Sequence, residues 1–199
     1  VRTRSANIAA IFTQASGTGP TLDQDATVLF HSNHANVQTT ALGTSVTAWE
    51  AASLECFNGT EIGSGKKIGT FAKYLLVPSA LYFQGLANFG YGDGYPTAYN
   101  PHAVSGRSAE DPRPEVLAVP DWTDATDWAY LADPRIFPVS HMSYSADPSG
   151  RAHPMPELFS VVSETAGMMF TNDTLPIKVR DEYAFGVNGY RGIGKRNVA

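Results

Sequence analysis

The chain has 199 residues and a formal net charge of −5 at pH 7, with 43% hydrophobic residues and only 17% charged ones. This length and composition suffice for one large domain or two small ones with a real core, which excludes a disordered chain. The acidic balance argues against a dedicated nucleic-acid binder, because phosphate affinity comes from clustered Lys and Arg.

Cysteine content, hydropathy and the placement of basic residues limit the compartment and the partners of the protein. A single cysteine, Cys56, excludes an internal disulfide framework and suits a reducing compartment. No apolar run approaches the roughly 20 residues that cross a bilayer, so we expect no membrane among the partners. The only basic cluster comprises Arg191, Lys195 and Arg196, and we interpret it as a solvated tail.

A weak helical stripe opens the chain. Between Val1 and Gln14, the apolar Ile8, Ile11 and Phe12 share one side, which predicts the last turns of a helix. Because the sequence starts at Val1 and not at Met, inside this helix, we expect the natural chain to begin further upstream.

A second helix is predicted over residues 47–57. Thr47 and Glu50 have the spacing of a capping box, and the stripe Trp49, Ala52, Ser53, Cys56 and Phe57 has helical spacing. The stripe is suited to packing on a core.

The middle of the chain combines a strand, a third helix and a long loop. The apolar run 71–77 predicts a strand that ends at Pro78, where Ser79 opens a helix with Tyr82, Gly85, Leu86 and Phe89 on one face. Residues 90–114 are rich in Gly, Tyr and Pro and lack periodicity. A loop of this length is usually functional or an assembly surface.

Strands dominate from residue 115 onward. Short apolar or alternating segments predict strands at 115–119, 128–132, 139–144, 158–162 and 168–170. The clearest alternation covers 175–190, where we expect one long, one-sided strand covered by the helix at 47–57. The fold class predicted is α+β with a mostly antiparallel sheet.

The candidate chemical motifs are weak. His31 and His34 lie three apart in a predicted loop and lack the intervening Glu of a zinc-hydrolase motif, so we favour a structural role for both. The Gly-rich segment 63–67 fails the spacing of a phosphate-binding loop. Asp124 and Asp127 suit turns and caps better than a cation site.

Four segments, in order, resemble the Mu-like branch of phage head major subunits, which share the Hong Kong 97-type capsid fold. They are Leu29–Asn36 (LFHSNHAN), Tyr74–Leu81 (YLLVPSAL), Trp128–Pro134 (WAYLADP), and a closing stretch from Lys178–Asp181 (KVRD) through Arg191-Gly192 to Lys195–Asn197. Ala35 stands where the family usually has Gly. Each motif alone is weak, but four in the same order cover nearly the whole chain.

The resemblance implies a two-domain architecture. Residues 1–70 and 151–199 would form a peripheral domain with the end of the spine helix, the helix at 47–57 and the final long strand. Residues 71–150 would form an axial domain, with loop 90–114 as a contact surface near the symmetry axes. An N-terminal arm and an extended loop precede this region in the family, and a chain without them should build shells poorly.

The function implied is that of a non-enzymatic structural subunit. Copies of the chain would self-assemble into capsomer rings and an icosahedral phage head, enclosing double-stranded DNA without sequence-specific binding. Scaffolding, decoration and portal proteins are the further partners implied, with assembly in the host cytoplasm and the virion capsid as the final location. We assign no catalytic, cofactor-binding or metal-binding residue and expect no cofactor.

Three alternatives stay open at this point. The first is a nanocompartment subunit of the same fold that encloses a protein cargo. The second is a metal-dependent hydrolase using His31 and His34. The third is a carbohydrate- or receptor-binding β-domain that uses Tyr91, Tyr95 and Tyr99.

Overall fold

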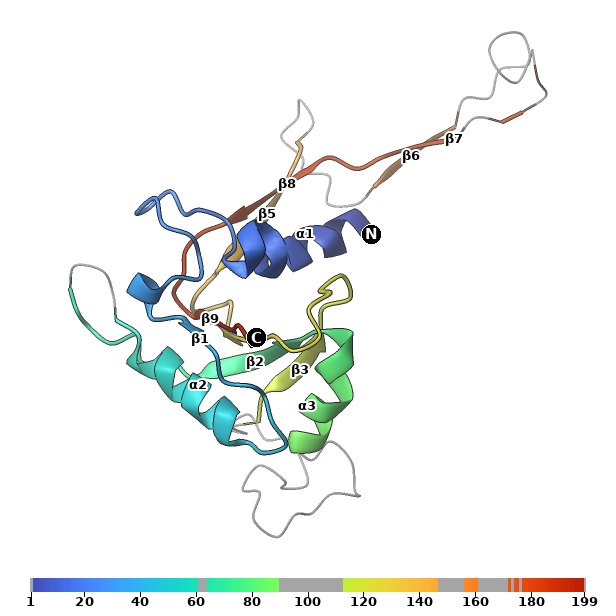
Figure 1. Cartoon of the computed structure of the whole chain (residues 1–199). Coiled ribbons are helices and arrows are strands. Elements are labelled where there is room, and N and C mark those ends of the chain that lie inside the picture. The colour runs from blue at the N-terminus through green and yellow to red at the C-terminus, as the bar shows by residue number, and fades with distance from the viewer. Residues whose placement is uncertain are drawn as a thin grey trace. The chain divides into compact units, whose positions relative to one another are not determined.

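The chain divides into two compact units. The computed structural model describes residues 2–60, 64–89, 113–146, 156–160, 172, 174–175 and 177–198, with side chains from residue 6 onward. The first unit comprises residues 1–139 and 187–199, and the second comprises residues 140–186. Helices and strands of both units make the fold class α+β, as predicted (Figure 1). The division into a peripheral and an axial domain stays a prediction.

The three predicted helices are confirmed. Helix α1 covers Arg2–Thr13 and continues into the 3-10 turn η1 (Gln14–Gly17), α2 covers Thr47–Asn58, and the 3-10 turn η3 (Ser79–Leu81) leads into α3 (Tyr82–Asn88). The predicted capping box is wrong, because α2 begins one residue early. Its N-cap is Val46, whose side chain cannot accept a hydrogen bond. None of the helices among the described residues is both long and apolar enough to cross a bilayer.

The first unit is built on a five-stranded sheet with the order β1-β9-β4-β2-β3. The strands are β1 (Val37–Gln38), β2 (Ala72–Val77), β3 (Glu115–Ala118), β4 (Trp128–Ala132) and β9 (Ile193–Arg196). β1 with β9 and β2 with β3 are parallel, whereas β2 with β4 and β4 with β9 are antiparallel. The sheet is therefore mixed, and the expectation of a mostly antiparallel sheet is corrected.

Helices α1 and α2 lie on opposite faces of this sheet (Figure 1). On the α2 face, Trp49, Ala52 and Cys56 join Trp128 and Tyr130 in a buried apolar cluster, so the predicted stripe packs on a core as expected. On the α1 face, the Phe12 ring stacks on Phe30 and Trp122 at centroid distances of 5.9 and 4.4 Å. Both faces of the central strands are therefore covered.

The expected long strand over 175–190 is wrong. The chain forms β7 (Ile177–Arg180) and β8 (Tyr183–Val187) and, after a turn, β9. Asp181 and Glu182 interrupt the first pair, and Gly192, with a φ of 76°, turns the backbone before β9 through a conformation that side chains disfavour. Helix α2 contacts β2, β4 and β9.

The second unit contains two strand pairs. β5 (Ser140–Tyr144) pairs with β8, and β6 (Glu157–Ser160) pairs with β7 in antiparallel fashion. On the β6–β7 ribbon, Leu158 lies opposite Val179, and both side chains are more than half exposed. The predicted strand at 168–170 and the loop residues 90–112 lie outside the described residues.

Candidate functional site

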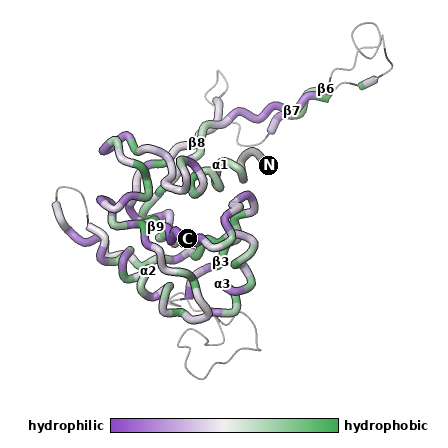
Figure 2. Tube along the Cα trace, in the orientation of Figure 1, coloured by the Kyte–Doolittle hydropathy of each residue, from purple (hydrophilic) through white to green (hydrophobic). Residues whose placement is uncertain are grey.

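The basic cluster near the end of the chain is buried, so its interpretation as a solvated tail is wrong. Lys195 and Arg196 are 1% and 3% exposed. They belong to β9, which lies between β1 and β4, and Figure 2 colours this end of the chain as hydrophilic. Since successive side chains of a strand point to opposite faces, Lys195 faces α1 and Arg196 faces α2.

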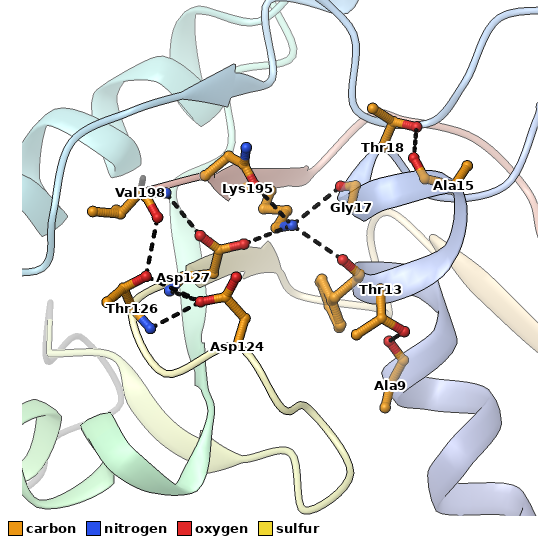
Figure 3. Close-up of polar contacts among 12 residues, drawn as sticks. Ala9, Thr13, Ala15, Gly17, Thr18, Asp124, Thr126, Asp127, Lys195 and Val198 are labelled. Carbon is orange, nitrogen blue, oxygen red and sulfur yellow. Dashed lines mark hydrogen bonds and ion pairs between the residues drawn. The ribbon is translucent and has the colours of Figure 1, made fainter.

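Lys195 is held by four oxygen atoms (Figure 3). Its Nζ lies 2.7 Å from Asp127 Oδ2 and donates to the carbonyl oxygens of Phe12 and Gly17 at 3.0 and 3.1 Å, and to Asn197 Oδ1 at 3.2 Å. The two carbonyls belong to the carboxyl end of α1 and its 3-10 extension, where a cation is favourable. This one side chain therefore ties the first helix to the sheet.

A turn before β4 positions the acidic partner. Asp124 Oδ1 accepts hydrogen bonds from the backbone N–H of Thr126 and Asp127 at 3.0 and 3.2 Å. These bonds, that from Thr126 first, lower the pKa of the Asp124 carboxyl. The predicted turn role of Asp124 is confirmed. Asp127 differs: it is 1% exposed, and its Oδ1 accepts from the backbone N–H of Val198 at 2.7 Å.

Arg196 makes the equivalent contact on the other face. Its guanidinium nitrogens lie 2.8 and 3.3 Å from the two carboxylate oxygens of Glu55 on α2, a fork-like pairing. The Tyr130 hydroxyl donates to Glu55 Oε1 at 3.2 Å. Burial, with the Glu55 charge second, raises the pKa of Tyr130 well above its usual value. Burial also raises the pKa of the neighbouring Cys56 to about 12, so its thiol stays protonated.

The histidine segment is a structured loop. The His31 and His34 rings lie 6.1 Å apart, but His31 Nδ1 accepts from the Asn33 N–H at 3.1 Å. Both ring nitrogens of His34 are also engaged, Nδ1 with the Leu29 carbonyl at 3.0 Å and Nε2 with Asp25 Oδ2 at 2.6 Å. These contacts favour the structural role predicted for both residues.

The structure of the same loop accounts for the residue types at two of its positions, Asn36 and Ala35. Asn36 is 3% exposed and donates to the carbonyl oxygens of Leu29 and Ile193, which joins the loop to β9. Ala35 has a φ of 52°, in the left-handed region where glycine is favoured. The phage head subunits that this segment resembles usually have Gly where this chain has Ala35. The backbone conformation at Ala35 is one that Gly adopts more readily.

The other candidate motifs contribute no binding geometry within the residues that the structure describes. Lys67 of the Gly-rich segment donates to Asn58 Oδ1 at 2.7 Å, and Gly63 lies outside the described residues, as do Tyr91, Tyr95 and Tyr99. Asp133 pairs with Lys73 at 2.7 Å. Within the described part of the chain, no group of three or more His, Cys, Asp or Glu side chains is arranged to hold a metal ion.

Comparison with known proteins decides the family. A family model described as phage capsid protein matches residues 1–195. The chain belongs to the phage capsid protein family. No curated protein and no solved structure matches it significantly. Members of a capsid family are structural, non-enzymatic proteins of the virion head, so this capsid protein is a shell subunit that associates with copies of itself.

In this capsid protein, the polar residues described above stabilise the fold: their buried ion pairs join α1 and α2 to the central sheet. Sequence reasoning missed Asp127, Lys195 and Arg196 because partners far along the chain determine their burial. One signal was present: Lys195 and Arg196 fall within the closing segment that resembles the phage head subunits, and charged residues inside a fold-wide motif are better read as structural than as a tail.

Proposed function

We propose that this chain is a major capsid subunit of the Hong Kong 97 type, of the Mu-like branch, and that it builds an icosahedral head enclosing double-stranded DNA. The observation that carries the proposal is the capsid family match over residues 1–195. The four ordered sequence segments support the finer assignment. In this arrangement residues 1–70 and 151–199 form the peripheral domain and residues 71–150 the axial domain.

The exposed apolar side chains support self-association. On the β6–β7 ribbon, Leu158, Ile177 and Val179 are 69%, 61% and 62% exposed. Register places Leu158 opposite Val179, with Ile177 two residues along on the same face. A two-stranded ribbon is at best marginally stable alone in water. An apolar surface supplied by a second copy would stabilise this one.

The net negative charge of the chain supports the proposal that the shell encloses DNA without binding it strongly. The net charge is −5, and two of the three residues in the basic cluster are buried in ion pairs. Buried cations are unavailable to phosphates, so the described surface gains little affinity for nucleic acid from them.

Electron microscopy of the purified full-length protein tests the proposal. We expect rings, sheets or closed shells whose abundance rises with protein concentration. A discrete monomer at every concentration and salt condition would contradict self-assembly. Particles purified from a producing host should contain DNA, whereas a defined protein cargo inside them would point to a nanocompartment of the same fold.

A further inference from the structure

The first unit contains an open pocket with a volume of about 260 Å³. Three segments form most of it, the loop around Asn33–Asn36, the carboxyl end of α2, and residues 190–193 before and at the start of β9, and Ile68 and Tyr130 complete the lining. One wall is rigid, because the Tyr190 ring stacks on His34 with a centroid distance of 4.0 Å and an interplanar angle of 2°.

The charges that line this pocket do not cancel. Glu55 is neutralised by Arg196 at 2.8 Å, and His34 already contacts Asp25. Arg191 also lines the pocket, is half-buried, and has a buried Nε with no hydrogen-bond acceptor among the described residues. The local excess is therefore one positive charge on a guanidinium.

An unpaired guanidinium in such a position favours an anion. A buried donor left without an acceptor is destabilising, and a planar guanidinium pairs well with a carboxylate through two parallel hydrogen bonds. Arg191 also lines a second cavity of about 200 Å³ beside Gln24 and Asn188. The half-buried side chain thus borders both cavities at the turn that precedes β9.

The surroundings favour a single negative charge over two. Asn58 and Gly59, at the carboxyl end of α2, line the pocket, and this end of a helix carries a partial negative charge. A dianionic phosphate would bring two negative charges to that end against a local excess of one positive charge, whereas a carboxylate matches this excess.

We propose that the Arg191 pocket receives a carboxylate side chain from a second copy of this chain. The proposal rests on the proposed self-assembly and adds a specific contact to it. The chain has 19 acidic and 14 basic residues, so neighbouring copies bring an excess of carboxylates together. Pairing one of them with the Arg191 guanidinium neutralises the local excess of positive charge.

Arg191→Gln tests the contact in an assembly assay, with Arg135→Gln as the matched control on an exposed arginine of the same unit. Light scattering against protein concentration should show that Arg191→Gln raises the concentration for half-assembly by roughly tenfold or more. The control should change it by less than about twofold. Wild-type assembly by Arg191→Gln with unchanged circular dichroism would overturn the proposal.

A titration with propionate, a free monocarboxylate, separates the pocket from the assembly. On the wild-type chain, the NMR resonance of the Arg191 Nε–H should shift saturably with propionate and less with inorganic phosphate. No shift, or tighter binding of phosphate, overturns the carboxylate site.

The assembly assay and the propionate titration can give negative results independently of each other. A wild-type chain that never associates contradicts the proposed function and the occupant assigned to the pocket, and the titration then decides whether the pocket binds a carboxylate at all. If Arg191→Gln does not fold, inhibition of wild-type assembly by propionate supports the contact, and unaltered assembly contradicts it.

Discussion

Strands β7 and β9 have similar sequences and opposite environments. β7 reads Ile-Lys-Val-Arg and is exposed along its whole length, with Ile177 and Val179 61% and 62% exposed. β9 reads Ile-Gly-Lys-Arg and is buried along its whole length, including both cations. β9 lies inside a five-stranded sheet with helices on both faces, whereas β7, among the described residues, pairs with β6 alone. The position of each strand in its sheet, more than the polarity of its side chains, therefore determines how deeply the strand is buried.

The largest expected effect comes from the buried cation on the α1 face. Lys195→Met removes the partner of Asp127 and should destabilise the chain by about 3–5 kcal/mol, because a buried charge is left uncompensated. Urea unfolding measures it, with Lys178→Met in the exposed β7 as the control. Adding Asp127→Leu to Lys195→Met should recover much of the loss, and an unchanged unfolding midpoint for Lys195→Met alone would show that Lys195 is not buried.

The arginine–glutamate pairs Arg196–Glu55 and Arg180–Glu157 give the next effect and a direct comparison of the strands. Arg196→Met, which leaves Glu55 unpaired beside Tyr130, should cost about 2–3 kcal/mol. Arg180 pairs with Glu157 at 2.9 Å, but the two side chains are 48% and 30% exposed. Arg180→Met should therefore cost less than about 1 kcal/mol. Equal losses for the two variants in urea unfolding would remove the distinction between the strands.

A smaller effect of opposite sign is expected beside β1. Ala35→Gly relieves a left-handed backbone conformation and should stabilise the chain by about 0.5–1 kcal/mol, after the greater freedom of Gly in the unfolded chain is subtracted. Thermal unfolding measures the change. Ala51→Gly, in the interior of α2, is the control and should destabilise. A lower melting temperature for Ala35→Gly would contradict the φ of 52° at this position.

The smallest effect concerns acid. The folded-state pKa of Asp124 lies below its ordinary value of 3.8, so its stabilising contribution is complete above that value and is lost as the pH falls through the folded pKa. Asp124→Asn keeps the side-chain oxygen acceptor without the charge. Its free energy of unfolding should decline less than that of the wild type between about pH 4 and about pH 2. Parallel declines would indicate that the turn is not held by the carboxylate.

Local patterns in the sequence predicted the local structure well. Strand β4 has the predicted bounds, and α2 and α3 bury the predicted faces, because apolar periodicity reports directly on a covered face. The alternation of apolar and polar residues over 175–190 led to a wrong prediction of one long, covered strand. Alternation alone does not show whether another helix or sheet covers the apolar face. Breaks at Asp181 and at the turn through Gly192 depend on backbone geometry that the apolar pattern does not encode.

The buried charges could not be predicted from local sequence. Lys195 requires Asp127 and the carbonyls of α1, and Arg196 requires Glu55, 141 residues earlier. A cation near the end of a chain is normally solvated. Only the three-dimensional arrangement shows that the carboxyl end of α1 and the strand β9 meet at this point.

The place of β9 in the sheet also sets an order of events during synthesis. β9 is translated after every other strand of the sheet, yet it occupies the position between β1 and β4. Until residues 193–196 leave the ribosome, those two strands have no partner between them, and the carboxyl end of α1 has no lysine to bind. The joining of β1 to β4 through β9 therefore cannot precede the synthesis of residues 193–196.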